Sequence, residues 1–114
     1  MTPPRIAMPR LAALLLACLP AAVLAAGEPE AGIAIENHRF VPERLEVPAG
    51  KKVKLTVENR DATPEEFESG ELRVEKVIPG KSKGIVYLGP LKAGEYPFFG
   101  EYHEKTARGV VVAK

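Results

Sequence analysis

The sequence predicts a small all-β protein, a sandwich or barrel of about seven short strands, preceded by a cleavable N-terminal segment. Three observations support this prediction. Short runs of residues alternate between apolar and polar side chains, which is the period of a half-buried strand. Glycine and proline separate these runs at a spacing of about ten residues. No long segment shows the helical period of apolar residues, apart from one candidate helical turn discussed below.

The first 26 residues are predicted to be a secretory signal peptide and not part of the fold. Arg5 and Arg10 form a positive start, and an apolar run follows over residues 11–26. The small residues at its end suit a signal peptidase. Pro20 interrupts the run, which is already short for a membrane anchor. We therefore expect a secreted protein with no direct membrane insertion after cleavage.

The mature chain is then expected to carry a linker at 27–31 and a single domain at 32–114. An alternative is a lipoprotein attached through Cys18, which the apolar residues continuing past Cys18 disfavour. Cleavage also removes Met1, Met8 and Cys18, which are all the sulfur-bearing residues of the chain. The mature protein would therefore have no disulfide and no soft metal ligand.

Charge and size exclude several classes of function. Without the two signal-segment arginines, 14 basic residues face 15 acidic ones. No basic run exceeds two lysines and none is interleaved with aromatic residues, so no nucleic-acid partner is expected. A mature chain of this length buries one modest core. We expect a monomer or a weak dimer.

The strands follow one another with turn residues between them. The clearest is "KKVKLTVEN", in which Val53, Leu55 and Val57 alternate with polar residues after the turn "PAG". Phe98 and Phe99 are adjacent, so one of them should enter the core. Strands are expected at residues 32–36, 44–47, 51–59, 71–78, 85–88, 95–99 and 109–113.

An acidic segment, "NRDATPEEFESGE" (residues 59–71), separates two of these strands. Its plain interpretation is a solvated loop with one helical turn, in which Thr63 is the N-cap and Pro64 the first residue. Its carboxylates repel one another, and a bound cation would relieve that repulsion. The sequence alone leaves both interpretations open.

Two histidines, His38 and His103, complete the inventory of reactive residues in the mature chain. Taken singly, each is more typical of a surface histidine than of a ligand. No nucleophile elbow supports a Ser–His–Asp triad, and the glycines form no phosphate-binding loop. An enzyme is therefore not expected.

The stretches "RFVPERLEVPAGKKVKLTVEN" and "GEYPFFGEYH" resemble the cupredoxin superfamily, over nearly all of residues 33–114. The set "NHRFVP", "DATPEEFES", "GPL" and "FFGEYH" looks like the EfeO-type cupredoxin-like domains. These are small periplasmic proteins or domains found with bacterial high-affinity iron permeases. The resemblance implies a Greek-key β-sandwich, a bound metal and an inner-membrane iron permease as partner.

The resemblance also shows a departure from the blue-copper pattern. The first histidine of that pattern falls on Glu65, the cysteine on Gly100, the second histidine on His103 and the methionine at or near Arg108. One ligand of four remains. A blue-copper electron-transfer site needs a thiolate, so we do not expect one here.

If the fold is that of the superfamily, one end of the sandwich should gather two imidazoles and several carboxylates. Glu65 and Glu66 are adjacent and should not bind the same ion. Among the carboxylates, Glu65 and Glu101 are favoured. The candidate metal ligands are His38, Glu65, Glu66, Glu68, Glu101 and His103.

Taken with this resemblance, the sequence predicts a periplasmic protein that binds copper or iron through histidine and carboxylate. The resemblance alone implies its setting, as an accessory of iron uptake. One alternative is a Cu(II) binding and delivery protein that uses the same residues. Another is a metal-free domain that docks on a membrane permease through Phe99, Tyr102 and the acidic segment. A ferroxidase ranks last, because the chain offers no visible redox partner for the ion.

Overall fold

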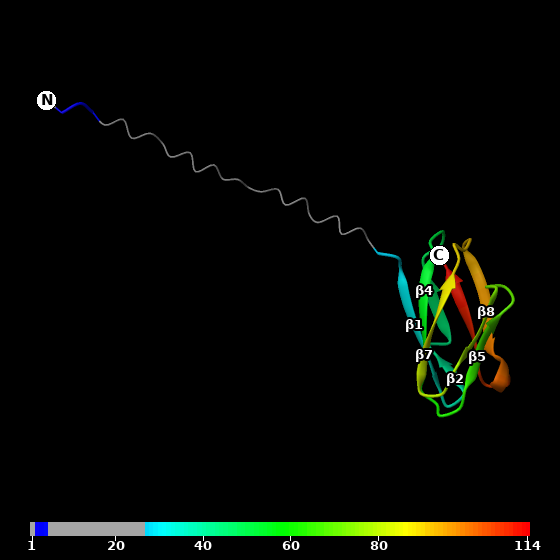
Figure 1. The fold of residues 1–114 in the computed structure, drawn as a ribbon. Helices are drawn as coiled ribbons and strands as arrows, with labels where there is room; N and C mark the ends of the chain where they lie inside the picture. The colour runs from blue at the N-terminus through cyan, green and yellow to red at the C-terminus, as the bar shows by residue number, and fades with distance from the viewer. Residues whose placement is uncertain (1, 5–26) are drawn as a thin grey trace.

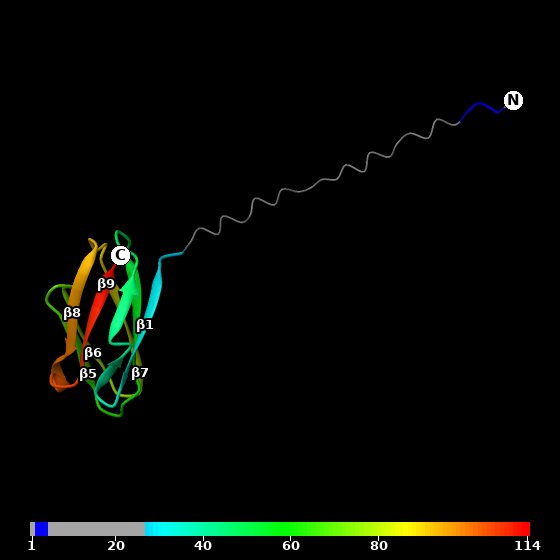
Figure 2. The same ribbon diagram turned by 180° about the vertical axis from the view of Figure 1, so that it is seen from behind.

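The computed structural model describes residues 2–4 and 27–114, and the predicted signal peptide otherwise lies outside the described residues. The domain is a sandwich of two β-sheets (Figures 1 and 2). One sheet has the order β2-β1-β4-β7 and the other β3-β9-β8-β5-β6. The strands are β1 (Glu30–Glu36), β2 (Arg39–Val41), β3 (Arg44–Val47), β4 (Val53–Asn59), β5 (Glu65–Ser69), β6 (Val74–Ile78), β7 (Ser82–Leu88), β8 (Gly94–Gly100) and β9 (Arg108–Ala113).

The predicted all-β sandwich is confirmed, and the alternation of β4 explains how its two faces arise. Val53, Leu55, Val57 and Asn59 are buried, whereas the residues between them are only half-buried. β4 pairs parallel with β1 and antiparallel with β7, and β3 pairs parallel with β9. Parallel neighbours need connections that leave the sheet, so the chain passes between the two layers.

Three phenylalanines form the centre of the core. Phe40, Phe67 and Phe98 come from β2, β5 and β8, and all are at most 2% exposed. Phe40 meets the other two edge-on, while Phe67 and Phe98 stack with centroids 4.9 Å apart. Such ring–ring contacts stabilise the core beyond the contribution from burying the rings. Phe99 is half-buried, so the prediction that one ring of the adjacent pair enters the core is confirmed.

The acidic segment departs from the expected loop. Residues 65–69 form strand β5 in the middle of a sheet, so the predicted helical turn beginning at Thr63 is wrong. With β2, this strand brings the described part of the chain to nine strands where about seven were expected. β1 begins at Glu30, within the segment expected to be a linker, and β6 begins only at Val74.

One end of the sandwich collects the segments that carry the candidate ligands. They are the β1–β2 turn at 37–38, the β4–β5 connection at 60–64 and the short 3-10 helix η1 (Glu101–His103) after β8. We call this the loop end. Within residues 2–4 and 27–114, no helix has the length and apolarity needed to span a membrane.

Candidate metal centre

His38 lies in a two-residue hairpin turn between β1 and β2. Asn37 and His38 both have positive φ, 52° and 58°, as a tight turn matching the strand twist requires. The Asp61 carboxylate accepts both turn amides, at 2.8 Å from Asn37 N and 2.9 Å from His38 N. Thr106 Oγ1 donates to the His38 carbonyl oxygen at 2.6 Å. The turn is therefore fixed from two other segments.

The surroundings of Asp61 favour the ionised form of its carboxyl group. Burial alone would raise its pKa, but the hydrogen bonds from the backbone N–H groups of His38 and Asn37 outweigh burial and hold the pKa below its usual value. Asn59 positions Asp61 in turn. Its buried side chain accepts the Asp61 N–H at 3.0 Å and donates to the carbonyl oxygens of Thr63 and Ile78.

Glu65 is the central carboxylate of the loop end. It is 1% exposed, and its Oε1 accepts the N–H groups of Glu66 and Tyr102, each at 3.0 Å. Its Oε2 lies 2.5 Å from Nδ1 of His103. A buried carboxylate needs such partners. Glu65 and His103 therefore direct two metal-binding atoms at each other across the interior of the loop end.

Gly100 leaves the space that Glu65 occupies. A Cβ at position 100 would lie 2.6 Å from Cδ of Glu65 and 2.7 Å from Cβ of Ala107, closer than real Cβ contacts. The backbone of Gly100 is extended and would accept any residue. The Glu65 carboxyl group thus lies where a cysteine at position 100 would need room, so the residues present do not fit a thiolate copper site.

His38 lies against His103. The two rings are stacked with centroids 3.5 Å apart and planes 14° from parallel. An imidazole nitrogen coordinates a metal in the plane of its ring. Two stacked, near-parallel rings therefore cannot coordinate the same ion until one of them tilts. Thr63 Oγ1 lies 3.5 Å from Nε2 of His38 and is the only hydrogen-bonding side chain recorded for that ring in the described residues. That contact is long, so it restrains the ring weakly.

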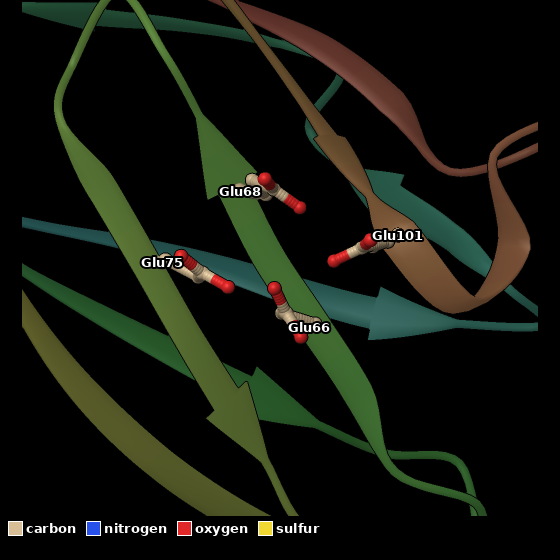
Figure 3. Close-up of side chains that lie close together, drawn as sticks. All are labelled: Glu66, Glu68, Glu75 and Glu101. Carbon is tan, nitrogen blue, oxygen red and sulfur yellow. The ribbon is translucent and has the colours of Figure 1, made fainter.

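A second group of ligands lies on the other face of β5. Because side chains alternate along a strand, Glu66 and Glu68 point away from Glu65. Glu75 of β6 pairs with Glu68 in register, and Glu101 begins η1. Figure 3 shows the four carboxyl groups turned toward one another. Carboxylate oxygens of these four residues all lie within 4.8 Å of one another.

The pKa values in this group reflect the crowding. The side-chain contact with Glu101 raises the pKa of Glu66 to about 7, aided by burial and by Glu75. The contact with Glu101 also raises the pKa of Glu68, while Glu68 and Glu66 lower the pKa of Glu101. The crowding therefore favours the protonated form of Glu66 and Glu68 and the ionised form of Glu101. Burial, followed by the charges of Glu66 and Glu101, raises the pKa of Tyr102.

The structure thus places the six predicted ligands in two groups. His38, Glu65 and His103 meet at the loop end, as expected from the resemblance. Glu66, Glu68 and Glu101 gather on the outer face of the five-stranded sheet. Glu101, expected beside Glu65, belongs to the second group because it precedes His103 by two residues at the start of η1.

Sequence reasoning missed three residues that shape these groups. Asp61 and Thr106 hold the His38 turn, and Glu75 completes the carboxylate group. Asp61 carries a signal, since it follows the strand-ending Asn59 and suits a turn. Glu75 had none, because its place depends on pairing with a strand that was expected to be a loop.

Arg108, at or near the position that the resemblance assigns to a methionine, takes no part in either group. Its Nε donates to the Glu104 carbonyl oxygen at 2.7 Å, and its guanidinium lies over the ring of Phe99. Arg108 is exposed.

Comparison with known proteins agrees with this architecture. The protein-family model described as a cupredoxin-like domain matches residues 8–113. An uncharacterized protein of Rickettsia prowazekii (strain Madrid E) is 45% identical over 84 residues. The match covers 73% of this chain and 66% of that relative, so the chain spans slightly less than two thirds of its length.

Solved structures show the same fold. A purple cupredoxin from Nitrosopumilus maritimus has a TM-score of 0.59 and 20% identity, covering 74% of this chain and 99% of its own. Auracyanin A, a blue copper protein from Chloroflexus aurantiacus, has a TM-score of 0.64 and 17% identity, and the match covers 77% of this chain and 100% of auracyanin A. A Cu(I) form of an amicyanin mutant has a TM-score of 0.59 and 25% identity, covering 73% and 80%.

Proposed function

This chain belongs to the cupredoxin-like domain family, and on that premise we propose that it is a periplasmic metal-binding protein. It holds a copper or iron ion through histidine and carboxylate at the loop end. It serves as an accessory of an iron-uptake system and meets an inner-membrane iron permease there. It binds and transfers its ion and does not catalyse a reaction.

The convergence of Glu65 and His103 carries this proposal. Oε2 of the buried Glu65 and Nδ1 of the partly exposed His103 lie 2.5 Å apart at the loop end, at two positions that match copper ligands in the blue-copper pattern. Nδ1 becomes a ligand only when it gives up its proton, so metal binding at this pair releases a proton. His38, whose ring is stacked on that of His103, would supply a third donor once its ring tilts.

The ligand types narrow the choice of ion. The described part of the chain has no cysteine or methionine, so a soft ion such as Cu(I) finds no sulfur there. Imidazole and carboxylate suit Cu(II), Fe(II), Fe(III) and Zn(II). The similar solved structures are described as a purple cupredoxin, a blue copper protein and amicyanin with Cu(I), and the last two favour copper among these ions. The "NHRFVP" and "DATPEEFES" motifs favour iron uptake as the setting.

Imidazole and carboxylate ligands can both bind the metal ion and release it. A thiolate-bound copper keeps its ion while electrons pass, whereas imidazole and carboxylate lose an ion when they take up protons. A site of this kind suits capture and delivery outside the inner membrane. Delivery of Cu(II) to another protein uses the same residues and differs in the partner.

One observation favours a second candidate, the metal-free docking domain. The Glu65 carboxylate already has three hydrogen-bond donors within the protein, so the loop end is stable without an ion. Tyr102 is 49% exposed beside it and offers a contact surface for a permease. Phe99 contributes less, because it is half-buried beneath Arg108.

Titration of the protein purified without chelator tests the proposal. Cu(II), Zn(II) and Fe(III) as its citrate complex are added separately, with affinity read by calorimetry and the copper complex by electron paramagnetic resonance. His103→Ala should weaken binding at least ten-fold, or about 1.4 kcal/mol, and nitrogen hyperfine lines lost in His38→Ala would add the second imidazole. Glu104→Gln, an exposed neighbour, is the control. Binding no tighter than about 0.1 mM, roughly −5.5 kcal/mol, would favour docking.

A further inference from the structure

Four carboxylates converge on the outer face of the five-stranded sheet, and three elements supply them. β5 contributes Glu66 and Glu68, β6 contributes Glu75 and η1 contributes Glu101. All four offer an oxygen within 4.8 Å of the others. The arrangement is fixed by the sheet, because Glu68 and Glu75 are paired in register and Glu66 is two residues from Glu68 on the same face.

Glu66 distinguishes this group from an ordinary acidic surface. The residue is only 7% exposed, yet its Oε1 is buried without a hydrogen-bond partner, and so is Oε2 of Glu68. In Figure 3 the Glu66 carboxyl group points into the space between the other three. Buried polar atoms are normally satisfied, so an unpartnered carboxylate at the floor of such a group indicates a missing positive partner.

The protein itself does not supply that partner. Among the described residues, none of the recorded ion pairs includes Glu66, Glu68, Glu75 or Glu101. Arg73 lines the same shallow depression as Glu68 and Glu75 without bonding to either of them. Carboxylates have no proton to donate to one another, so only a proton or a cation can hold them together.

We propose that Glu66, Glu68, Glu75 and Glu101 form a second cation site, separate from the loop end, for a hard di- or trivalent metal ion. An all-oxygen donor set selects hard ions over Cu(I) or Zn(II). Glu75 and Glu101 are exposed, so the ion enters from solvent, and the buried Glu66 closes the floor.

The two sites lie back to back and are separable. Adjacent residues Glu65 and Glu66 face opposite sides of β5, and η1 gives Glu101 to one group and His103 to the other. The second site uses no imidazole and does not depend on the ion at the loop end. Its presence or absence is therefore independent of the proposed function.

Terbium(III) is a suitable probe, because its emission is sensitised by nearby tyrosine and Tyr102 lies close enough for Glu66 and Glu101 to raise its pKa. The purified protein should show saturable emission. Glu66→Gln and Glu75→Gln should each weaken binding ten-fold or more, and Tyr102→Phe should dim the emission without changing the affinity found by calorimetry. Competition with Ca(II), Mn(II) and Fe(III) citrate then ranks the natural ions.

Two controls make the result decisive. Glu36→Gln removes one carboxylate from the opposite sheet, and His38→Ala removes a ligand of the loop end. Both should bind terbium as the unmodified protein does. If Glu66→Gln and Glu75→Gln bind as tightly as Glu36→Gln, the proposal is wrong. Glu75 is exposed, so its variant remains informative if Glu66→Gln folds poorly.

Discussion

Gly100→Ala tests whether Glu65 occupies the space of a side chain at position 100. The added Cβ would lie 2.6 Å from Cδ and 2.8 Å from Oε1 of Glu65, and 2.7 Å from Cβ of Ala107. Ordinary contacts begin near 3.4 Å, so Glu65 must retract by roughly 1 Å. Overpacking of this size costs about 1–3 kcal/mol. Retraction also weakens the buried hydrogen bonds to His103 and Tyr102, so we expect a loss of about 3 kcal/mol in unfolding free energy.

A double-mutant cycle separates this steric effect from other causes. Glu65→Ala alone should cost about 3 kcal/mol, since it leaves a cavity and an unpaired Tyr102 N–H. In the double variant the methyl group at position 100 no longer meets Glu65 and only its contact with Ala107 remains, so the coupling should reach about 2 kcal/mol. Urea unfolding followed by circular dichroism measures each term. Gly32→Ala is the control, because nothing lies within 4 Å of its Cβ position. If the stability losses of the two single variants add up to that of the double variant within about 0.5 kcal/mol, Glu65 does not occupy the space of a side chain at position 100.

Two further predictions concern the residues around the ligands. Glu66 has a pKa of about 7 in the folded protein against 4.5 ordinarily, so the metal-free protein should lose thermal stability as pH rises from about 5 to about 8. In that pH range the folded state binds one more proton than the unfolded state. If the thermal stability of a Glu66→Gln variant falls with pH as steeply as that of the unmodified protein, Glu66 is not the cause. Asp61→Ala should cost about 2 kcal/mol, because two amides of the His38 turn lose a charged acceptor. Urea unfolding checks it, and Asp61→Asn, which keeps one acceptor, should recover part of the loss.

Local periodicity was enough to predict most of the sandwich. The alternation in β4 needs no distant partner, because Val53, Leu55 and Val57 identify the buried face by themselves. That residues 27–114 offer no thiolate also follows from the chain alone, because they contain no cysteine. The meeting of His38 with His103 needed the resemblance, since 65 positions separate the two residues.

Strand β5 could not be recognised from its own residues. "EEFES" has a single apolar side chain, and two of its glutamates are buried through partners that lie far away in sequence. Glu65 owes its burial to His103 and the Tyr102 N–H, which follow it by 38 and 37 positions. Unless residues 65–69 are recognised as a strand, one cannot predict that Glu65 and Glu66 face opposite sides of the sheet. The pairing of Glu68 with Glu75 cannot be predicted either.

The side chain of Glu65 and any side chain at position 100 therefore compete for the same volume. Glu65 reaches into the interior only because position 100 has no side chain, and position 100 stays empty because Glu65 is held there by three hydrogen bonds. A cysteine introduced at Gly100 alone would meet the Glu65 carboxyl group and Ala107 before it reached any ion. Its thiolate would also lie against a buried carboxylate, and the two like charges would repel. Building a copper–thiolate site on this scaffold would require both positions to change together.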